Sequence, residues 1–334
     1  MSNKIRVIQY GVGPIGARVV RLMLEKPSLE IIGAIDTDPE KVGKDLGAVA
    51  GANRNTGVLV SADAKSVLHS GADVVLHTTS SYLRHVADQL IACVEAGLHV
   101  VSTCEELSYP FRKYPELSAR LDQCARENKV AMLGTGVNPG FAMDKLVLTL
   151  ATACHRVDKV EVHRIVNASK RRQPLQKKVG SGLTVDQFYA QRDAGIIKHH
   201  GLPESTAMIA DSLGLQVDRI EETIEPVIAK TMVKTDFFEV PPGRVVGVHQ
   251  VARGLASEAA NIHLELQMYL DAPDPIDAVK ITGVPGLELQ VPGGIHGDYA
   301  TAAVAVNCVP AILEAKPGLR TSKDIPMCYL PGIV

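Results

Sequence analysis

The sequence predicts an α/β fold, with a Rossmann-type, doubly wound parallel sheet joined to a second α+β domain built on a largely antiparallel sheet. In the first part of the chain, short apolar runs alternate with segments of helical periodicity, as in parallel sheets buried between helices. Beyond about residue 144, apolar and polar residues alternate within the runs, which is typical of strands with one packed face.

The N-terminal segment has the order strand, glycine turn, helix, strand. Residues 5–10 form a short apolar run, GVGPIG follows at once, and apolar residues then recur at helical spacing up to Met23. A second apolar run, LEIIGAID, ends at Asp36. This is a βαβ unit of the length that such a unit requires.

The alternation continues through the rest of the first domain. We expect strands at 72–77, 98–103 and 129–134, and helices at 83–96 and 117–128. The uninterrupted apolar centres of these strands predict burial on both faces. The sequence thus predicts a dinucleotide-binding domain over residues 1–145, completed by the C-terminal segment, about 299–334, whose helix packs back on it.

Residues 146–298 are expected to form a substrate-binding and dimerisation domain. The expected elements are antiparallel strands at 157–166, 243–252, 261–270 and 277–284 and helices near 184–194 and 204–213. The clearest strand is NIHLELQMYL (261–270), in which apolar and polar residues alternate throughout. Period two means that one face packs and that the other is solvated or lines a site.

The composition argues against several classes of protein. Apolar residues make up 46% and charged residues 22%, with a net charge of -2, which is unlike the basic excess of a nucleic-acid binder. No apolar run approaches the roughly 20 residues of a membrane span, and the first residues enter a strand pattern rather than a signal peptide. The six scattered cysteines predict reduced thiols in a cytoplasmic protein and no metal site.

The glycine motif at the start of the chain predicts a dinucleotide site. It consists of Gly11, Val12, Gly13, Pro14, Ile15 and Gly16. Gly11 permits the tight turn, Gly13 lets the backbone approach a pyrophosphate, and Gly16 lets helix and strand pack closely. The helix N-terminus receives the phosphates, and Pro14 suits its first turn. A lone G-x-G-x-x-G is weak evidence, but this one follows a strand, opens a helix and precedes an acidic strand end.

Asp36, followed by Thr37, is placed to accept hydrogen bonds from the adenine ribose. Its charge disfavours a 2′-phosphate, so NAD is the expected cofactor, and the nearby Lys41 leaves NADP use open. The alternative for Asp36 is an ordinary polar strand end.

Three loops at the carboxyl ends of the strands are expected to face the nicotinamide. Their polar residues are Thr78, Thr79, Ser80, Thr103 and Asn138. The hydroxyls of Thr79 and Ser80 suit the nicotinamide ribose and suit equally well a cap for the following helix. Asn138 suits the cofactor carboxamide or its own backbone.

Glu105 and Glu106 follow the strand at 98–103, where the nicotinamide should lie. A carboxylate there could attract a substrate ammonium, take its proton and activate water. Partial burial and a like-charged neighbour would raise its pKa toward a useful value. Glu105, nearer the strand end, is the catalytic candidate, with Glu106 in support or bonded to backbone or solvent. The alternative is that both glutamates are simply solvated.

Five segments carry longer motifs: VSTCEELSYP (101–110), GTGVNPGFAMD (134–144), KRRQPLQKKVGSG (170–182), VVGVHQVARG (245–254) and PGGIHGDYATAAVAVN (292–307). They resemble motifs of the native amine dehydrogenase and 2,4-diaminopentanoate dehydrogenase group, within the dihydrodipicolinate-reductase-like family. The resemblance spans nearly the whole chain. It implies NAD(P)-dependent deamination of a primary amine to a ketone or aldehyde and ammonia, reversible as reductive amination. It also implies a catalytic glutamate within 104–106 and a homodimer.

The chain departs from true dihydrodipicolinate reductases, which carry paired histidines followed by a lysine and a P-S-G-T turn. The later pair His199-His200 lacks that context and is expected to lie on the surface. A reductase of C=N or C=O bonds, 2,4-diaminopentanoate dehydrogenase proper and a redox-sensing dinucleotide-binding protein without turnover remain as alternatives. We expect neither nucleic-acid nor membrane partners.

The basic run KRRQPLQKK has two interpretations. It is a solvated face, or it is a mobile loop in which Arg171 or Arg172 grips a substrate carboxylate, which would favour a diamino acid. An apolar pocket would favour simple alkyl amines instead. Further candidate pocket walls are Asn138, Phe141, Leu175, His249 and His263. The alternative for His263 is a structural role, which is the commoner one for a lone histidine on a sheet, and no metal-ligand spacing surrounds it.

Overall fold

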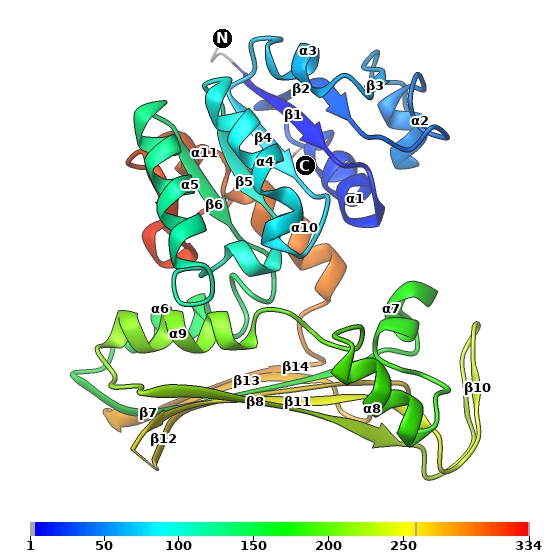
Figure 1. Cartoon of the computed structure of the whole chain (residues 1–334), viewed down its shortest axis with the longest axis vertical. Helices are drawn as coiled ribbons and strands as arrows, with labels where there is room; N and C mark the ends of the chain where they lie inside the picture. Colours follow the sequence, from blue (N-terminus) through cyan, green and yellow to red (C-terminus); the bar gives the residue numbers. More distant parts are fainter. Residues whose placement is uncertain (1–3, 258, 333–334) are drawn as a thin grey trace. The chain divides into compact units, whose positions relative to one another are not determined.

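A parallel sheet of seven strands forms the centre of the first of two structural units (Figure 1). This unit comprises residues 1–141 and 296–334, and the second comprises residues 142–295. The computed structural model describes residues 4–257 and 259–332. The strands of the first sheet are β1 (Ile5–Tyr10), β2 (Leu29–Ile35), β3 (Val60–Ser61), β4 (Val74–His77), β5 (His99–Ser102), β6 (Ala131–Gly134) and β15 (Gly318–Arg320).

The strand order is β15-β6-β5-β4-β1-β2-β3. It contains the order 3-2-1-4-5-6 of a doubly wound dinucleotide-binding sheet, extended by one strand at the β6 edge. The predicted fold class is confirmed.

Helices cover both faces of this sheet (Figure 1). They are α1 (Pro14–Met23), α2 (Leu46–Ala50), α3 (Ala64–Leu68), α4 (Leu83–Glu95), α5 (Pro115–Glu127), α10 (Gly297–Asn307) and α11 (Val309–Leu313), with short 3-10 turns η1 (Glu105–Leu107) and η2 (Ser322–Asp324). Val7 packs into one core with α1 and α10, and its neighbour Ile8 packs into a second core with α4. Both are fully buried, as an apolar run in a two-sided sheet requires.

The C-terminal segment differs from the single long helix that was expected. The helix breaks at Cys308 into α10 and α11, and Pro310 lies in the first turn of α11, where its missing N–H is tolerated. The chain then adds β15 beside β6. This strand of three residues is too short to show any periodicity in the sequence.

The second unit is built on a six-stranded mixed sheet with the order β14-β13-β7-β12-β11-β8. Its strands are β7 (Arg156–Asn167), β8 (Arg219–Ile228), β11 (Val245–Ala256), β12 (Ala259–Tyr269), β13 (Ile276–Val284) and β14 (Leu287–Pro292). All neighbours are antiparallel except β7 and β12, which run parallel. The expectation of antiparallel pairing was wrong at this one pair, and β8 and β14 were not predicted.

Four helices and a small hairpin complete the second unit. The helices are α6 (Lys145–Ala151), α7 (Gln173–Lys178), α8 (Val185–Asp193) and α9 (Leu202–Leu213), and the hairpin strands are β9 (Val233–Lys234) and β10 (Glu239–Val240). Helix α9 lies along one face of the large sheet and packs on β8, β11 and β12 (Figure 1). Ile262, Leu264 and Leu266 of β12 are fully buried, which confirms the predicted packed face.

Within the basic run at 170–178, residues Gln173–Lys178 form helix α7 rather than a loop. Gln176 is fully buried, and its Nε2 donates to the carbonyl oxygens of Ser169 (3.0 Å) and Arg171 (2.7 Å). Its Oε1 accepts from the Thr235 hydroxyl at 2.9 Å. Arg171 is only 8% exposed, so the solvated-face interpretation is wrong for this residue.

Candidate active site

The glycine loop joins β1 to α1 at the carboxyl edge of the first sheet. Gly11 has φ +87, where a side chain is strained, and a Cβ there would lie 2.8 Å from Thr79 Cγ2. A Cβ at Gly16 would lie 2.1 Å from the Gly11 carbonyl oxygen, so only glycine allows this approach of helix to strand. A Cβ at Gly13 would meet nothing within 4 Å.

The open space at Gly13 lies at the N-terminus of a ten-residue helix. Pro14 occupies the first turn, and within the described part of the chain no side chain caps this helix. The remaining backbone N–H groups and the positive end of the helix dipole suit a phosphate. The residues present therefore fit a dinucleotide, with Val12 and Ile15 completing the loop.

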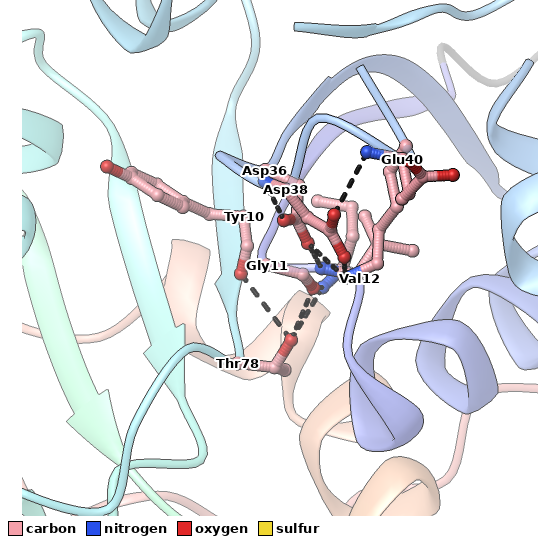
Figure 2. Close-up of polar contacts among 9 residues, drawn as sticks. Tyr10, Gly11, Val12, Asp36, Asp38, Glu40 and Thr78 are labelled. Atoms are coloured by element: carbon pink, nitrogen blue, oxygen red, sulfur yellow. Dashed lines mark hydrogen bonds and ion pairs between the residues drawn. The ribbon is translucent and has the colours of Figure 1, made fainter. Parts of the chain in front are cut away.

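Two polar side chains, Thr78 and Gln9, brace this loop, and Figure 2 shows the contact of Thr78 with Gly11. Thr78 Oγ1 donates to the Gly11 carbonyl oxygen at 2.7 Å. Gln9, fully buried in β1, donates through Nε2 to the same carbonyl (2.7 Å) and to Thr78 Oγ1 (2.9 Å). Thr78 thus holds the loop in shape. Gln9 was missed in the sequence, where the signal was a polar residue inside an apolar strand.

Asp36 directly follows β2 and is bonded to the glycine loop (Figure 2). Its Oδ2 accepts the Val12 N–H at 2.7 Å, and its Oδ1 accepts the Asp38 N–H at 3.0 Å. Lys41 Nζ lies 3.2 Å from a carboxylate oxygen of both Asp36 and Asp38. Burial alone would raise the pKa of Asp36, but these hydrogen bonds and the lysine charge lower it. Thr37 beside it is exposed.

The two adjacent glutamates lie in the turn η1, directly after β5. Glu106 is 2% exposed, and its Oε2 accepts the Leu83 N–H at 2.8 Å, at the start of α4. Lys113 Nζ lies 2.6 Å from its Oε1, and the Tyr114 hydroxyl donates to Oε2 at 3.0 Å. Burial would raise the pKa of Glu106, but these partners lower it below its usual range. Glu106 is therefore a buried, ionised cap for α4.

Glu105 stands one residue nearer the strand end and is half-buried. The backbone around it is held on both sides, because the Cys104 N–H is bonded by Ser102 Oγ (3.1 Å) and the Glu106 N–H by the Ser81 carbonyl (3.2 Å). The structure thus places Glu105 at the sheet edge where β1, β4 and β5 end.

The hydroxyl residues of the loops after β4 and β5 have local roles. Thr79 Oγ1 donates to Oε1 of Gln89, a residue in the middle of α4, at 2.9 Å. The alternative that Thr79 caps the N-terminus of this helix was therefore wrong. Ser80 Oγ accepts the Tyr82 N–H, one residue before the helix, at 3.3 Å. The Thr103 N–H donates to the carbonyl oxygen of His77 at 2.9 Å.

The loop after β6 is a closely packed turn. Gly140 has φ +121, and a Cβ there would lie 2.4 Å from the Gly136 nitrogen. Thr301 of α10 accepts the Val137 N–H through its Oγ1 at 3.3 Å. Asn138 is 6% exposed within this turn, and Phe141 is half-buried.

The second unit does not bring all the predicted pocket residues together. Arg171, Arg172 and Leu175 lie at α7, whereas His263 points to the sheet face opposite the packed residues of β12. There Glu265 lies 3.7 Å from His263 Nε2 and 2.8 Å from His249 Nε2. Burial, and then the nearby Arg253, lower the pKa of His263. His263 and His249 therefore belong to a surface cluster around Glu265.

The expectation of a surface histidine pair was also wrong. His200 is 5% exposed, and the backbone of His199 is bonded twice by the fully buried side chain of Gln250. Burial lowers the pKa of His199 to about 3. No group of three or more potential ligands for a metal ion occurs in residues 4–257 and 259–332. None of the helices in those residues is long and apolar enough to span a membrane.

The fold and the glycine loop define an NAD(P)-dependent dehydrogenase with a Rossmann-type domain. Residues 141–330 match the family model of the 2,4-diaminopentanoate dehydrogenase C-terminal domain, and residues 5–105 match that of the dihydrodipicolinate reductase N-terminus. The chain belongs to the 2,4-diaminopentanoate dehydrogenase family, whose members are oxidoreductases acting on amino groups.

Relatives along the whole chain agree with this assignment. The chain is 32% identical to 2,4-diaminopentanoate dehydrogenase of Acetoanaerobium sticklandii, over 97% of this chain and 94% of the relative. It is 26% identical to an amine dehydrogenase of Streptomyces virginiae, over 97% and 96% respectively. The solved structure of the amine dehydrogenase from Mycobacterium smegmatis superposes with a TM-score of 0.86 at 29% identity, covering 98% of this chain and 97% of that one.

Proposed function

We propose that the chain catalyses NAD-dependent oxidative deamination of a primary amine to a ketone or aldehyde and ammonia, reversible as reductive amination, with Glu105 as acid/base. The observation that carries the proposal is the position of Glu105. It lies in the turn after β5, at the sheet edge that also carries the glycine loop. Its neighbour Glu106 is buried and is bonded by the Leu83 N–H, Lys113 and Tyr114, as expected of a structural cap.

The residues around the glycine loop would hold the cofactor. The N–H groups at the start of α1 would bind the pyrophosphate over Gly13, and Asp36 would accept a ribose hydroxyl. The ionised Asp36 favours NAD, because a 2′-phosphate would meet its negative charge. Lys41, held between Asp36 and Asp38, supplies a cation at that carboxylate and leaves NADP as a secondary cofactor.

In the proposed mechanism Glu105 binds the substrate ammonium and removes its proton. When bound, the nicotinamide supplies the acceptor for hydride from the substrate carbon. After releasing that proton to solvent, Glu105 accepts a proton from the water that adds to the iminium carbon and passes it to the departing ammonia. Hydrogen bonds to the N–H groups of Cys104 and Glu106 fix the backbone on both sides of Glu105 before the substrate arrives.

A diamino acid is the first specific substrate candidate. The relative from Acetoanaerobium sticklandii is named for 2,4-diaminopentanoate, and the buried Arg171 at the start of α7 provides a cation of the kind that binds carboxylates bidentately. Plain alkyl amines are the second candidate, since the relative from Streptomyces virginiae is named only as an amine dehydrogenase.

The decisive experiment measures NAD+ and NADP+ reduction with 2,4-diaminopentanoate, short alkyl amines and cyclic amines. Glu105→Gln should lose most turnover and keep its affinity for NADH, measured by fluorescence titration. Turnover of a carbonyl compound without ammonia would instead indicate a C=O reductase. Absence of amine-dependent NADH formation in the unmodified protein would leave a dinucleotide-binding sensor. Plain amines reacting as fast as the diamino acid would remove the proposed role of Arg171 and Arg172.

The assembly and location are part of the same proposal. We expect a cytoplasmic homodimer, which analytical ultracentrifugation would test. The cysteines of the described chain are free thiols, and Cys93 and Cys104 are buried, as in a reducing compartment. A monomer at micromolar concentration would contradict the proposed assembly.

A further inference from the structure

A buried histidine stands between the ends of two neighbouring strands, at the sheet edge that carries Glu105. His77 ends β4, is fully buried, and is paired across the parallel sheet with Ser102, which ends β5. Its Nδ1 lies 2.9 Å from Ser102 Oγ, and its Nε2 lies 2.9 Å from Gln89 Oε1 of α4. The edge-on ring of Tyr10 lies 5.3 Å away, centroid to centroid. The imidazole is thus held from several sides.

The hydrogen-bond partners assign the proton of this ring. Ser102 Oγ accepts the Cys104 N–H at 3.1 Å, so its own hydrogen is available for one donation. His77 Nδ1 lies at the right distance to accept it, which leaves the ring proton on Nε2. That nitrogen faces two oxygens, Gln89 Oε1 at 2.9 Å and Thr79 Oγ1 at 3.0 Å. Thr79 in turn donates to Gln89, so the donors and acceptors match.

Burial keeps the ring neutral near pH 7. It lowers the pKa of His77 to about 4, and the hydrogen bond to Gln89 offsets only part of this effect. A neutral imidazole with its proton on Nε2 retains Nδ1 as an acceptor, so the bond from Ser102 persists under ordinary conditions.

Ser102 connects the histidine to the backbone of the catalytic turn. With its hydrogen directed to His77, the lone pairs of Ser102 Oγ face the Cys104 N–H, one residue before Glu105. If His77 could not accept, the serine hydroxyl would rotate toward another acceptor, and the Cys104 N–H would lose its aligned partner. A displacement of about 1 Å in a reacting group can reduce the rate by about 100-fold.

From this geometry we infer that His77, as the neutral Nε2–H tautomer, is a positioning residue that acts through Ser102 on the turn carrying Glu105. The inference deepens the proposed function and rests on the role assigned there to Glu105. His77 itself exchanges no proton with the substrate in this scheme.

Two substitutions of His77 provide a matched test. In His77→Asn the amide oxygen can take the place of Nδ1 and accept from Ser102, whereas in His77→Gln the amide takes the place of Nε2 and leaves Ser102 without that acceptor. We expect His77→Gln to reduce kcat by about 10- to 100-fold with unchanged NADH affinity, and His77→Asn to stay within about threefold of the unmodified enzyme. Urea unfolding of both variants controls for general damage.

Ser102→Ala completes a double-mutant cycle. It should reduce kcat as much as His77→Gln does, and the double variant should lose no more than either single variant, because both changes break one chain of contacts. Equal losses in His77→Asn and His77→Gln, or losses that multiply in the double variant, would overturn the inference.

The tautomer can be tested without any activity measurement. In protein labelled with ¹⁵N-histidine, with His77→Asn used to assign the signals, Nε2 of His77 should carry the proton and Nδ1 should not. An Nδ1–H ring would overturn the inference. Full turnover in Glu105→Gln would refute the proposed function and this inference together. An inactive Glu105→Gln beside a fully active His77→Gln would refute the inference alone.

Discussion

Gly13 and Gly16 allow cofactor binding to be separated from folding with two small substitutions. At Gly13 an added Cβ meets nothing within 4 Å, and the backbone angles of φ -74 and ψ -172 are open to alanine. Gly13→Ala should therefore change the free energy of unfolding by less than about 1 kcal/mol. The methyl group would occupy the space proposed for the pyrophosphate. We expect the Kd for NADH to rise by about tenfold or more, equivalent to about 1.4 kcal/mol.

Gly16→Ala should behave differently. Its Cβ would lie 2.1 Å from the Gly11 carbonyl oxygen and 2.6 Å from Thr78 Oγ1, far inside a normal contact of about 3.5 Å. The first obstacle is backbone and cannot rotate away, so α1 must shift from β1. Overpacking of this kind costs about 1–3 kcal/mol of unfolding free energy. Gly16→Ala should thus lose stability and NADH affinity together.

The assays are urea unfolding followed by circular dichroism and NADH titration followed by fluorescence. Two results would refute the reasoning. Unchanged NADH affinity in Gly13→Ala would show that the pyrophosphate does not lie over this residue. Unchanged stability in Gly16→Ala would show that the approach of helix to strand is looser than the structure indicates.

Three further predictions follow from buried or paired charges. Glu106→Gln should destabilise the fold by about 1–3 kcal/mol, because the charged cap of Leu83 is lost. The pKa of Glu106 is lowered in the folded state, so the loss of unfolding free energy in Glu106→Gln should be complete above pH 4.5 and should shrink as the pH falls below that value. Urea unfolding at a series of pH values measures this loss. Lys41→Gln should reduce kcat/KM with NADP+ by about tenfold relative to kcat/KM with NAD+. An unchanged ratio of the two values would contradict the proposal that the charge of Lys41 permits NADP use. Arg164 forms a buried ion pair with Asp277, which is 3% exposed, and Arg164→Met would leave that carboxylate without its partner. The substitution should lower the free energy of unfolding by about 3–5 kcal/mol. Near-normal stability in urea would show that the Arg164–Asp277 pair does not stabilise the fold.

The features predicted correctly from the sequence are those that depend on neighbouring residues. The strand, glycine turn and helix around Gly11 follow from local backbone geometry and from the spacing of apolar residues, and the structure shows each element. The two-sided burial of the first sheet and the alternating faces of β12 follow in the same way, because periodicity reflects burial. The glutamate pair was visible as two charges at the end of an apolar run.

Contacts between distant parts of the chain could not be predicted in this way. Nothing local shows that Glu106 is buried as a cap, because only the fold brings the Leu83 N–H, 23 residues away in sequence, to its carboxylate. Gln9 and Thr78, 69 residues apart, meet beneath the glycine loop. The parallel pairing of β7 with β12 likewise depends on the path of the chain between them.

The sequence by itself determined the fold class, the glycine loop and the strand end that presents a carboxylate, because periodicity, glycine conformation and strand ends are properties of short segments. Tertiary structure alone decided which glutamate is buried as a cap, which basic residues are enclosed and which side chains contact the ring of His77. Those outcomes depend on which donors and acceptors the fold brings within hydrogen-bond distance. Burial matters as well, because a buried polar group without a hydrogen-bond partner destabilises the fold.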